Sequence, residues 1–190
     1  MNIVLDLDGV ICDFITGYEK LFGGHVNLPE LSLSKEQWKK IDNDTGFWLG
    51  LPIASGGKYL MSLGEVPTNY FILTSRNEKK TRSDTLVWLK RHDIGIADEN
   101  VLFANPRAAK IEYLKRLAPL KFLDDSIGTV DVADTLRDVE ATLMLQPYNG
   151  ACALRYFPSM DVTNSVEKWL MGDYHGKRST MPELSAQSRR

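Results

Sequence analysis

The feature that most constrains the fold of this chain is a set of short apolar runs, each of which ends abruptly in polar residues. The first run, Ile3 to Leu5, stops at Asp6-Leu7-Asp8-Gly9. A later run at 70–73 stops at Thr74-Ser75-Arg76, and another at 121–123 stops at Asp124-Asp125-Ser126. Apolar runs this short and without alternation are typical of strands buried on both faces, as in a parallel sheet.

Helical patterns separate these runs. They cover residues 79–91, 107–117 and 130–139, and two more apolar runs, at 101–103 and 141–145, complete a set of about five predicted strands. Strands that alternate with helices along the chain predict an α/β fold built on a parallel sheet.

The long segment between Asp8 and Thr74 interrupts this alternation. A helical pattern begins near Asp13, and Ser34 to Gln37 form a capping box that predicts the start of a second helix. The segment has room for a small helical cap inserted after the first strand, but not for a large second domain.

We therefore predict two parts and a tail. Residues 1–13 and 66–175 form the core, residues 14–65 form the cap, and the polar residues 176–190 form a flexible tail.

The charge balance argues against a nucleic-acid-binding protein. The 190 residues carry a net charge of -2, whereas nucleic-acid-binding domains show a basic excess.

The two cysteines, Cys12 and Cys152, lie far apart and predict reduced core residues rather than a disulfide framework or a zinc site. No apolar run is as long as a membrane span, and the N-terminus does not look like a signal peptide, so we expect a cytoplasmic protein with no membrane partner.

The polar residues at the strand ends predict a reactive site, because ligands bind at the carboxyl ends of strands in open parallel sheets. Four carboxylates, those of Asp6, Asp8, Asp124 and Asp125, would repel one another there unless a cation lay among them. Oxygen ligands of this kind suit Mg²⁺ together with a substrate phosphate.

The first pair of carboxylates also fits covalent catalysis. Asp6, at the very end of its strand, is suited to be a nucleophile that forms an aspartyl-phosphate. Asp8 lies on the same side and can act as general acid and base, while Thr74 and a lysine neutralise the phosphoryl oxygens.

Each motif has a plainer interpretation on its own. Asp-x-Asp-Gly also occurs in turns and calcium loops, Thr-Ser after a strand is commonly a helix cap, and Asp-Asp is commonly a solvated turn. The three motifs together, each directly after a buried strand and in this order, favour a catalytic site.

This order of motifs resembles the haloacid dehalogenase-like phosphatase superfamily over residues 1–150. The resemblance implies a Rossmann-like core, with Mg²⁺ held by the Asp6 side chain, the Asp8 carbonyl and the acidic pair. Asp125 is the favoured direct ligand and Asp124 lies behind it, although the two could exchange roles. The phosphate lysine of the family matches Lys110, with Lys115 and Lys121 as rivals.

More narrowly, the chain resembles the 5'(3')-deoxyribonucleotidases. The likeness rests on Asp8-Gly-Val-Ile-Cys-Asp-Phe14, Gly46-Phe47-Trp48 and Leu51-Pro52-Ile53, and also on Gln146-Pro147-Tyr148-Asn149 after the fifth predicted strand. It implies a nucleoside monophosphate as substrate and an aromatic wall of Phe14, Phe47 and Trp48 against the base, although all three rings could instead be cap core. Ser75 and Arg76 are further candidates for substrate binding.

Two departures keep the substrate open. Arg76 stands where the family usually has proline, and the segment after Pro52 lacks a second proline-glycine-alanine run. The alternatives are a polynucleotide 3'-phosphatase, which would want a basic groove, a sugar-phosphate phosphatase, and a non-catalytic binding protein, against which the presence of Asp6 and Asp8 argues. A homodimer is compatible with the sequence.

Overall fold

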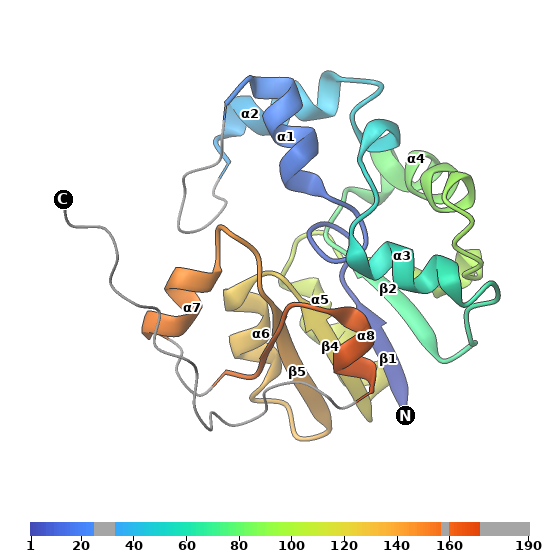
Figure 1. Cartoon of the computed structure of the whole chain (residues 1–190), viewed down its shortest axis with the longest axis vertical. Helices are drawn as coiled ribbons and strands as arrows, with labels where there is room; N and C mark the ends of the chain where they lie inside the picture. Colours follow the sequence, from blue (N-terminus) through green and yellow to red (C-terminus); the bar gives the residue numbers. More distant parts are fainter. Residues whose placement is uncertain (25–32, 157–159, 172–190) are drawn as a thin grey trace.

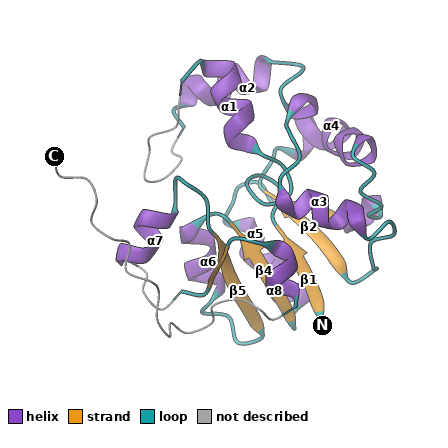
Figure 2. Ribbon diagram, viewed as in Figure 1, coloured by secondary structure: helices purple, strands orange, loops and turns teal. Residues whose placement is uncertain are grey.

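In the computed structural model, residues 1–24, 33–156 and 160–171 are described, and within them the chain forms a six-stranded parallel sheet of order β3-β2-β1-β4-β5-β6 (Figures 1 and 2). The strands are β1 (Asn2–Leu5), β2 (Tyr70–Thr74), β3 (Val101–Phe103), β4 (Leu120–Asp124), β5 (Val139–Met144) and β6 (Val162–Thr163). The predicted α/β class, with helices inserted after the first strand, is confirmed. The sixth strand was not predicted, because two residues are too few to carry an apolar pattern.

The helices occupy the connections between the strands. They are α1 (Phe14–Phe22), α2 (Lys35–Asn43), η1 (Trp48–Gly50), α3 (Ser55–Ser62), α4 (Glu78–Arg91), η2 (Asp98–Asn100), α5 (Ala109–Leu117), α6 (Ile127–Ala133), α7 (Gly150–Tyr156) and α8 (Val166–Leu170). The helix expected at 130–139 is wrong in its bounds. It begins at Ile127 and ends at Ala133, because Val139 already pairs with Leu120 as the first residue of β5.

The sheet is covered on both faces, as its continuous apolar strands predict. Alternate residues of β1 point to opposite sides. Ile3 and Leu5 pack in a cluster with residues of α3, α4 and α8, whereas Val4 packs in a second cluster with residues of α5, α6 and α7.

Helices α1 and α2 lie above the end of the sheet toward which β1 runs (Figure 1), and their buried Phe14 and Ile41 belong to the same cluster as Ile3 and Leu5. The Asp13 side chain caps α1 by accepting from the Thr16 N–H, and the predicted capping box of α2 is present between Ser34 and Gln37. Gln37 also donates to the Tyr18 hydroxyl of α1 at 2.5 Å, so the two helices are joined by a side-chain contact.

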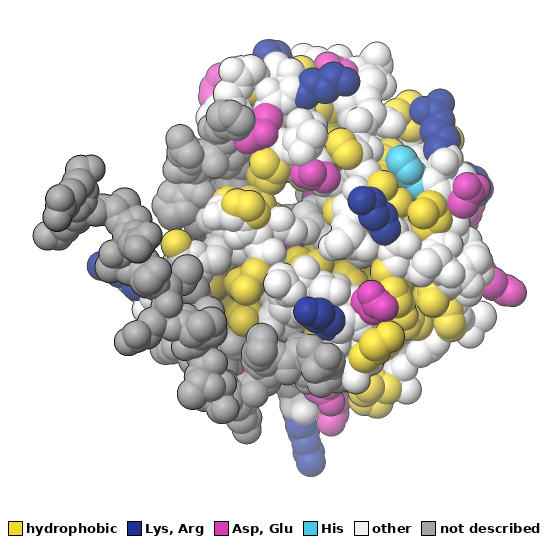
Figure 3. Space-filling view, in the orientation of Figure 1, with side chains coloured by type: hydrophobic (Ala, Val, Ile, Leu, Met, Phe, Trp, Pro, Cys, Tyr) yellow, Lys and Arg dark blue, Asp and Glu magenta, His cyan; other side chains and the backbone are white. Residues whose placement is uncertain are grey.

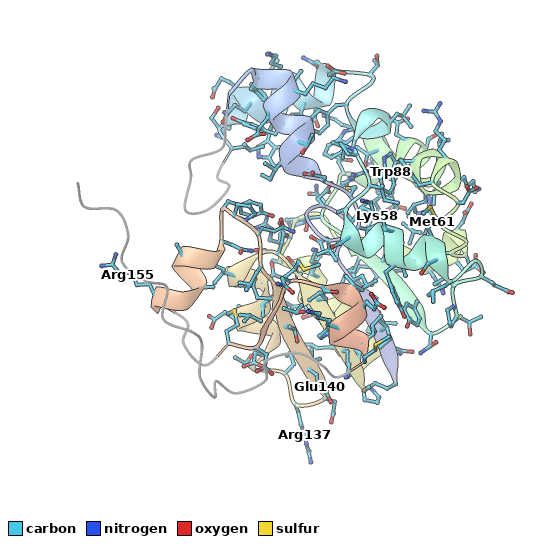
Figure 4. The ribbon with its side chains drawn as sticks, in the orientation of Figure 1. Lys58, Met61, Trp88, Arg137, Glu140 and Arg155 are labelled. Carbon is cyan, nitrogen blue, oxygen red and sulfur yellow. The ribbon has the colours of Figure 1, made fainter. Side chains whose placement is uncertain are left out.

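The return from α2 to the sheet is anchored on the core. The indole of Trp88 on α4 donates to the Leu51 carbonyl at 2.8 Å (Figure 4), and Gly56 and Gly57 of α3 lie against the carbonyls of Val10 and Ile11. A Cβ on Gly56 or Gly57 would lie 2.5 Å from those backbone oxygens, so α3 can approach this closely only with glycine there.

Two expectations concern other parts of the chain. The predicted flexible tail, 176–190, lies outside the described residues. Within the described residues, no helix combines the length and the apolar character that crossing a membrane requires.

The anchoring of α8 on the sheet gives a first prediction. The buried Trp169 indole donates to the Thr142 hydroxyl at 3.1 Å. Thr142→Val keeps the shape of the side chain but leaves the indole N–H without this acceptor, and we expect a loss of about 1–3 kcal/mol in the free energy of unfolding. Urea denaturation measures the loss, with the exposed Thr68→Val as the control. Equal stability of the two variants would contradict the prediction.

Candidate active site

Three carboxylates meet at the carboxyl edge of the sheet. Strands β1 and β4 are neighbours in register, so Asp6, which follows β1, lies beside Asp124 and Asp125 at the end of β4. Each of the three offers an oxygen within 4.8 Å of the others. Asp6 and Asp124 are buried, with 6% and 0% of their surfaces exposed, so water screens their charges poorly.

A buried lysine holds two of these carboxylates. Lys110, on α5, donates from Nζ to Asp6 Oδ1 and to Asp124 Oδ2, both at 2.7 Å. Burial disfavours the charged ammonium, but Asp124 and Asp6 outweigh burial and raise the pKa of Lys110. The rival lysines lie elsewhere: Lys115 is paired with Glu112 on the exposed side of α5, and Lys121 lies 3.7 Å from Glu140.

One lysine does not neutralise three carboxylates. Burial raises the pKa of Asp6 to about 7, Lys110 opposes the rise, and the charges of Asp124 and Asp8 add to it. Burial, followed by repulsion from Asp124 and Asp6, raises the pKa of Asp125 as well. The site therefore favours an added positive charge, and its donors are all oxygens, which hard divalent cations prefer.

The two adjacent aspartates differ in what their oxygens contact. Asp124 accepts from Lys110 on Oδ2 and from the Ser126 N–H on Oδ1, at 2.7 Å each. Asp125 accepts from the Tyr148 hydroxyl on Oδ2, and Oδ1 has no protein donor among the described residues. Asp125 is thus the member of the pair with an oxygen left for a cation.

Asp8 is held by Arg76. The guanidinium donates to both carboxylate oxygens of Asp8, from Nε at 3.0 Å and from a terminal nitrogen at 2.7 Å, and to the Thr85 hydroxyl at 3.0 Å. It also lies 4.3 Å from the centre of the Trp48 ring. Arg76 is 5% exposed, so it fixes the orientation of Asp8 from within the protein rather than from the surface.

Of the two hydroxyl residues at the end of β2, Ser75 faces the cavity and Thr74 does not. Thr74 is fully buried, and its hydroxyl accepts from the Arg76 N–H at 3.2 Å. Ser75 lines the cavity, and its buried hydroxyl has no partner among the described residues. An unpartnered buried hydroxyl is a group that a ligand would satisfy.

A cavity of about 630 Å³ opens above the carboxylates, between the sheet and the inserted helices. Several residues of its lining were not predicted as site residues. Asn105, Pro106 and Arg107 come from the turn between β3 and α5, which carries no strand-end acid or other local signal. Tyr148 and Asn149 follow β5 and belong to the segment 146–149 that resembles the deoxyribonucleotidases, but that resemblance gave them no role in the site.

The three predicted aromatic residues form one packed cluster. Phe14, Phe47 and Trp48 have ring centroids 5.0–6.2 Å apart and are at most 7% exposed. Phe14 and Trp48 line the cavity, whereas Phe47 is not part of its lining.

A fourth aromatic residue, Trp38, was missed. It lines the cavity from α2, lies 6.1 Å from the Phe14 ring and is 44% exposed. The signal was present in the sequence, because the predicted capping box at Ser34 starts a polar helix whose apolar residues are Trp38 and Ile41. Only Ile41 of these two is buried.

Comparison with known proteins supports the fold. No protein-family model and no curated protein sequence matches the chain. Among solved structures, 17 chains match. One is the crystal structure of a HAD family hydrolase from Deinococcus radiodurans R1 with bound phosphate and sodium, at 13% identity and a TM-score of 0.58, covering 92% of this chain and 97% of that one. The chain therefore has a haloacid dehalogenase-like fold, as its motifs predict.

The buried carboxylates predict an unusual pH dependence of the free energy of unfolding, to be measured with chelator present so that no metal ion is bound. The pKa of Asp6 rises from its ordinary 3.8 to about 7 on folding, so between these values the folded protein binds a proton that the unfolded chain has lost. The free energy of unfolding should therefore fall as the pH rises from 5 to 7. Urea denaturation across this range measures the fall.

Asp6→Asn should show a smaller fall, because the amide does not ionise. The exposed Asp134→Asn serves as the control and should behave as the wild type. If Asp6→Asn and wild type fell equally, the buried carboxylate would not be the cause.

Proposed function

We propose that this protein is a Mg²⁺-dependent phosphomonoesterase that works through an aspartyl-phosphate at Asp6. The observation that carries the proposal is the position of Asp6. It lies at the carboxyl edge of the sheet, beside the cavity, with Oδ1 fixed by Lys110 and two further carboxylates within 4.8 Å.

The donor set fits Mg²⁺. Asp6 and Asp125 would hold the ion together with the carbonyl of Asp8, and Asp124 would hold Lys110 beside them. When bound, the ion supplies positive charge that neutralises the phosphate and the carboxylates. The phosphate and sodium bound to the Deinococcus hydrolase are properties of that protein, and they support a phosphate ligand here.

The protein groups then divide the reaction between them. A carboxylate oxygen of Asp6 attacks phosphorus, and the bond from phosphorus to the leaving oxygen breaks. Asp8 gives the leaving oxygen a proton, for which one Asp8 oxygen must first leave Arg76 and be protonated. Asp8 next takes a proton from water, whose oxygen attacks the same phosphorus, and the Asp6 carboxylate is released with inorganic phosphate. Lys110 and the unpartnered Ser75 hydroxyl are placed to bind phosphoryl oxygens.

The cavity lining supports a nucleoside monophosphate as substrate. Its volume lies within the usual range for small-molecule sites, about 300–1,000 Å³. Trp38 is the lining ring best suited to stack on a base, because it is exposed and also contacts the buried Phe14 ring. Trp48 is less suited, since the Arg76 guanidinium lies over its ring.

The face shown in Figure 3 does not favour a polynucleotide substrate. The Lys and Arg side chains of its described residues are spread singly among acidic and apolar ones, rather than gathered in a stripe that could follow a phosphate backbone.

Phosphate release tests the reaction. The purified protein with Mg²⁺ should release phosphate from deoxynucleoside monophosphates faster than from sugar phosphates or a 3'-phosphorylated oligonucleotide. Asp6→Asn should abolish release, and Asp8→Asn should lower kcat by about 10²–10⁴-fold. Activity that survives Asp6→Asn would rule out the aspartyl-phosphate, and preference for the oligonucleotide would exclude the nucleotidase.

Stacking on Trp38 has its own prediction. Trp38→Ala should raise KM for deoxynucleoside monophosphates by about 5–150-fold, because base stacking contributes about 1–3 kcal/mol. Trp38→Phe should retain most of the affinity, and KM for a sugar phosphate should stay unchanged. An equal rise in KM for both substrates would mean that the ring shapes the cavity instead of binding the base.

A further inference from the structure

The turn after β5 reaches both loops that carry the carboxylates. The connection from β5 to α7 runs over residues 145–149 and includes Gln146, Pro147, Tyr148 and Asn149. Nothing in the proposed chemistry uses these residues, yet three of their side chains make hydrogen bonds to the acidic loops. We call Gln146, Tyr148 and Asn149 the clamp.

One contact of the clamp goes to the loop after β1. Gln146 donates from its side-chain amide to the Gly9 carbonyl at 2.5 Å. Gly9 has a φ of 84°, and a Cβ there would overlap the Asp125 carboxylate and lie 2.8 Å from the Tyr148 hydroxyl. Gly9 is thus the point where both acidic loops and the clamp come together.

Another contact goes to the backbone of the loop after β4. The Asn149 side-chain amide donates to the Asp125 carbonyl at 2.7 Å and to the Met144 carbonyl at 2.9 Å, and its oxygen accepts from the Gln146 N–H at 2.8 Å. Asn149 is 2% exposed. It therefore ties the loop after β4 to the end of β5 with bonds that water does not compete for.

The remaining contact reaches the carboxylate itself. The Tyr148 hydroxyl donates to Asp125 Oδ2, and the Tyr148 side chain is packed so that 8% of the residue is exposed. Because Tyr148 binds Oδ2 and Asn149 holds the Asp125 backbone, the orientation of the remaining carboxylate oxygen, Oδ1, is fixed.

We propose that Gln146, Tyr148 and Asn149 are positioning residues for a divalent cation, which set the place of the free Asp125 oxygen relative to Asp6. The inference rests on the cation of the proposed function. Mg²⁺ demands near-ideal octahedral geometry at about 2.0–2.1 Å, whereas Ca²⁺ accepts longer and less regular bonds. A clamp that fixes ligand oxygens therefore favours Mg²⁺ over Ca²⁺.

Isothermal titration of the chelator-treated full chain with Mg²⁺, and separately with Ca²⁺, tests the clamp. Tyr148→Phe keeps the ring but removes the donor, and it should weaken Mg²⁺ binding by about 10–100-fold, with a smaller loss for Ca²⁺. Gln146→Ala should also lower the ratio of the Mg²⁺ affinity to the Ca²⁺ affinity. Tyr113→Phe, in a partly buried tyrosine of α5 that does not line the cavity, is the matched control and should bind as the wild type.

The outcomes separate the clamp from the proposed function. Weaker Mg²⁺ binding with a lower Mg²⁺-to-Ca²⁺ ratio supports the clamp, even if no phosphomonoester is hydrolysed. Unchanged affinities, or equal losses for both ions, would overturn it and leave the phosphatase proposal standing. A wild type that binds neither ion would overturn the clamp together with the metal dependence of the proposed function.

Discussion

The contact on which the site depends is the buried ammonium of Lys110 between Asp6 and Asp124. Two carboxylates from adjacent strands could not remain ionised side by side in a dry interior without a cation between them, because burial and mutual repulsion both favour their protonated forms. Lys110 supplies that charge from α5, with 2.7 Å bonds to each. Its single positive charge contacts two of the three carboxylates and offsets one negative charge. Ionised, the three carboxylates would therefore leave a surplus of negative charge at the cavity, where the proposed metal ion and phosphate would bind.

Much of this site could be predicted from the sequence, because the acidic residues of the site lie at the ends of apolar strands. Once strands are parallel, their ends share one edge, so Asp6 and Asp124 could be expected together without knowledge of any side-chain contact. The same reasoning places Arg76 and Asp8 at this edge, because they follow the neighbouring strands β2 and β1, but it did not predict that their side chains pair. The segment that contains Tyr148 was noted for its family resemblance, but the contact of Tyr148 with Asp125 was not predicted, since the turn after a strand shows no periodicity that would reveal where its side chains point.

Errors in element bounds had a related cause. The helix expected at 130–139 was assigned from its apolar residues alone, but Val139 belongs to β5 through its pairing with Leu120. Pairing across 19 residues is a tertiary property, and it overrides local preference at the end of an element. The two-residue β6 exists only because Val162 and Thr163 pair with the end of β5, so no local pattern could have predicted it.

Arg76 joins the cavity wall to the reactive loop, and this limits how the aromatic residues can be interpreted. Its guanidinium contacts both Asp8 oxygens and the face of Trp48, so a change of Trp48 alters the surroundings of the residue that orients Asp8. An effect of such a change on kcat would not distinguish lost base stacking from a displaced acid. Trp38, on α2, contacts Phe14, whereas the Arg76 guanidinium lies over the Trp48 ring. Substrate preference can therefore be separated from chemistry at Trp38, whereas at Trp48 the two are coupled through Arg76.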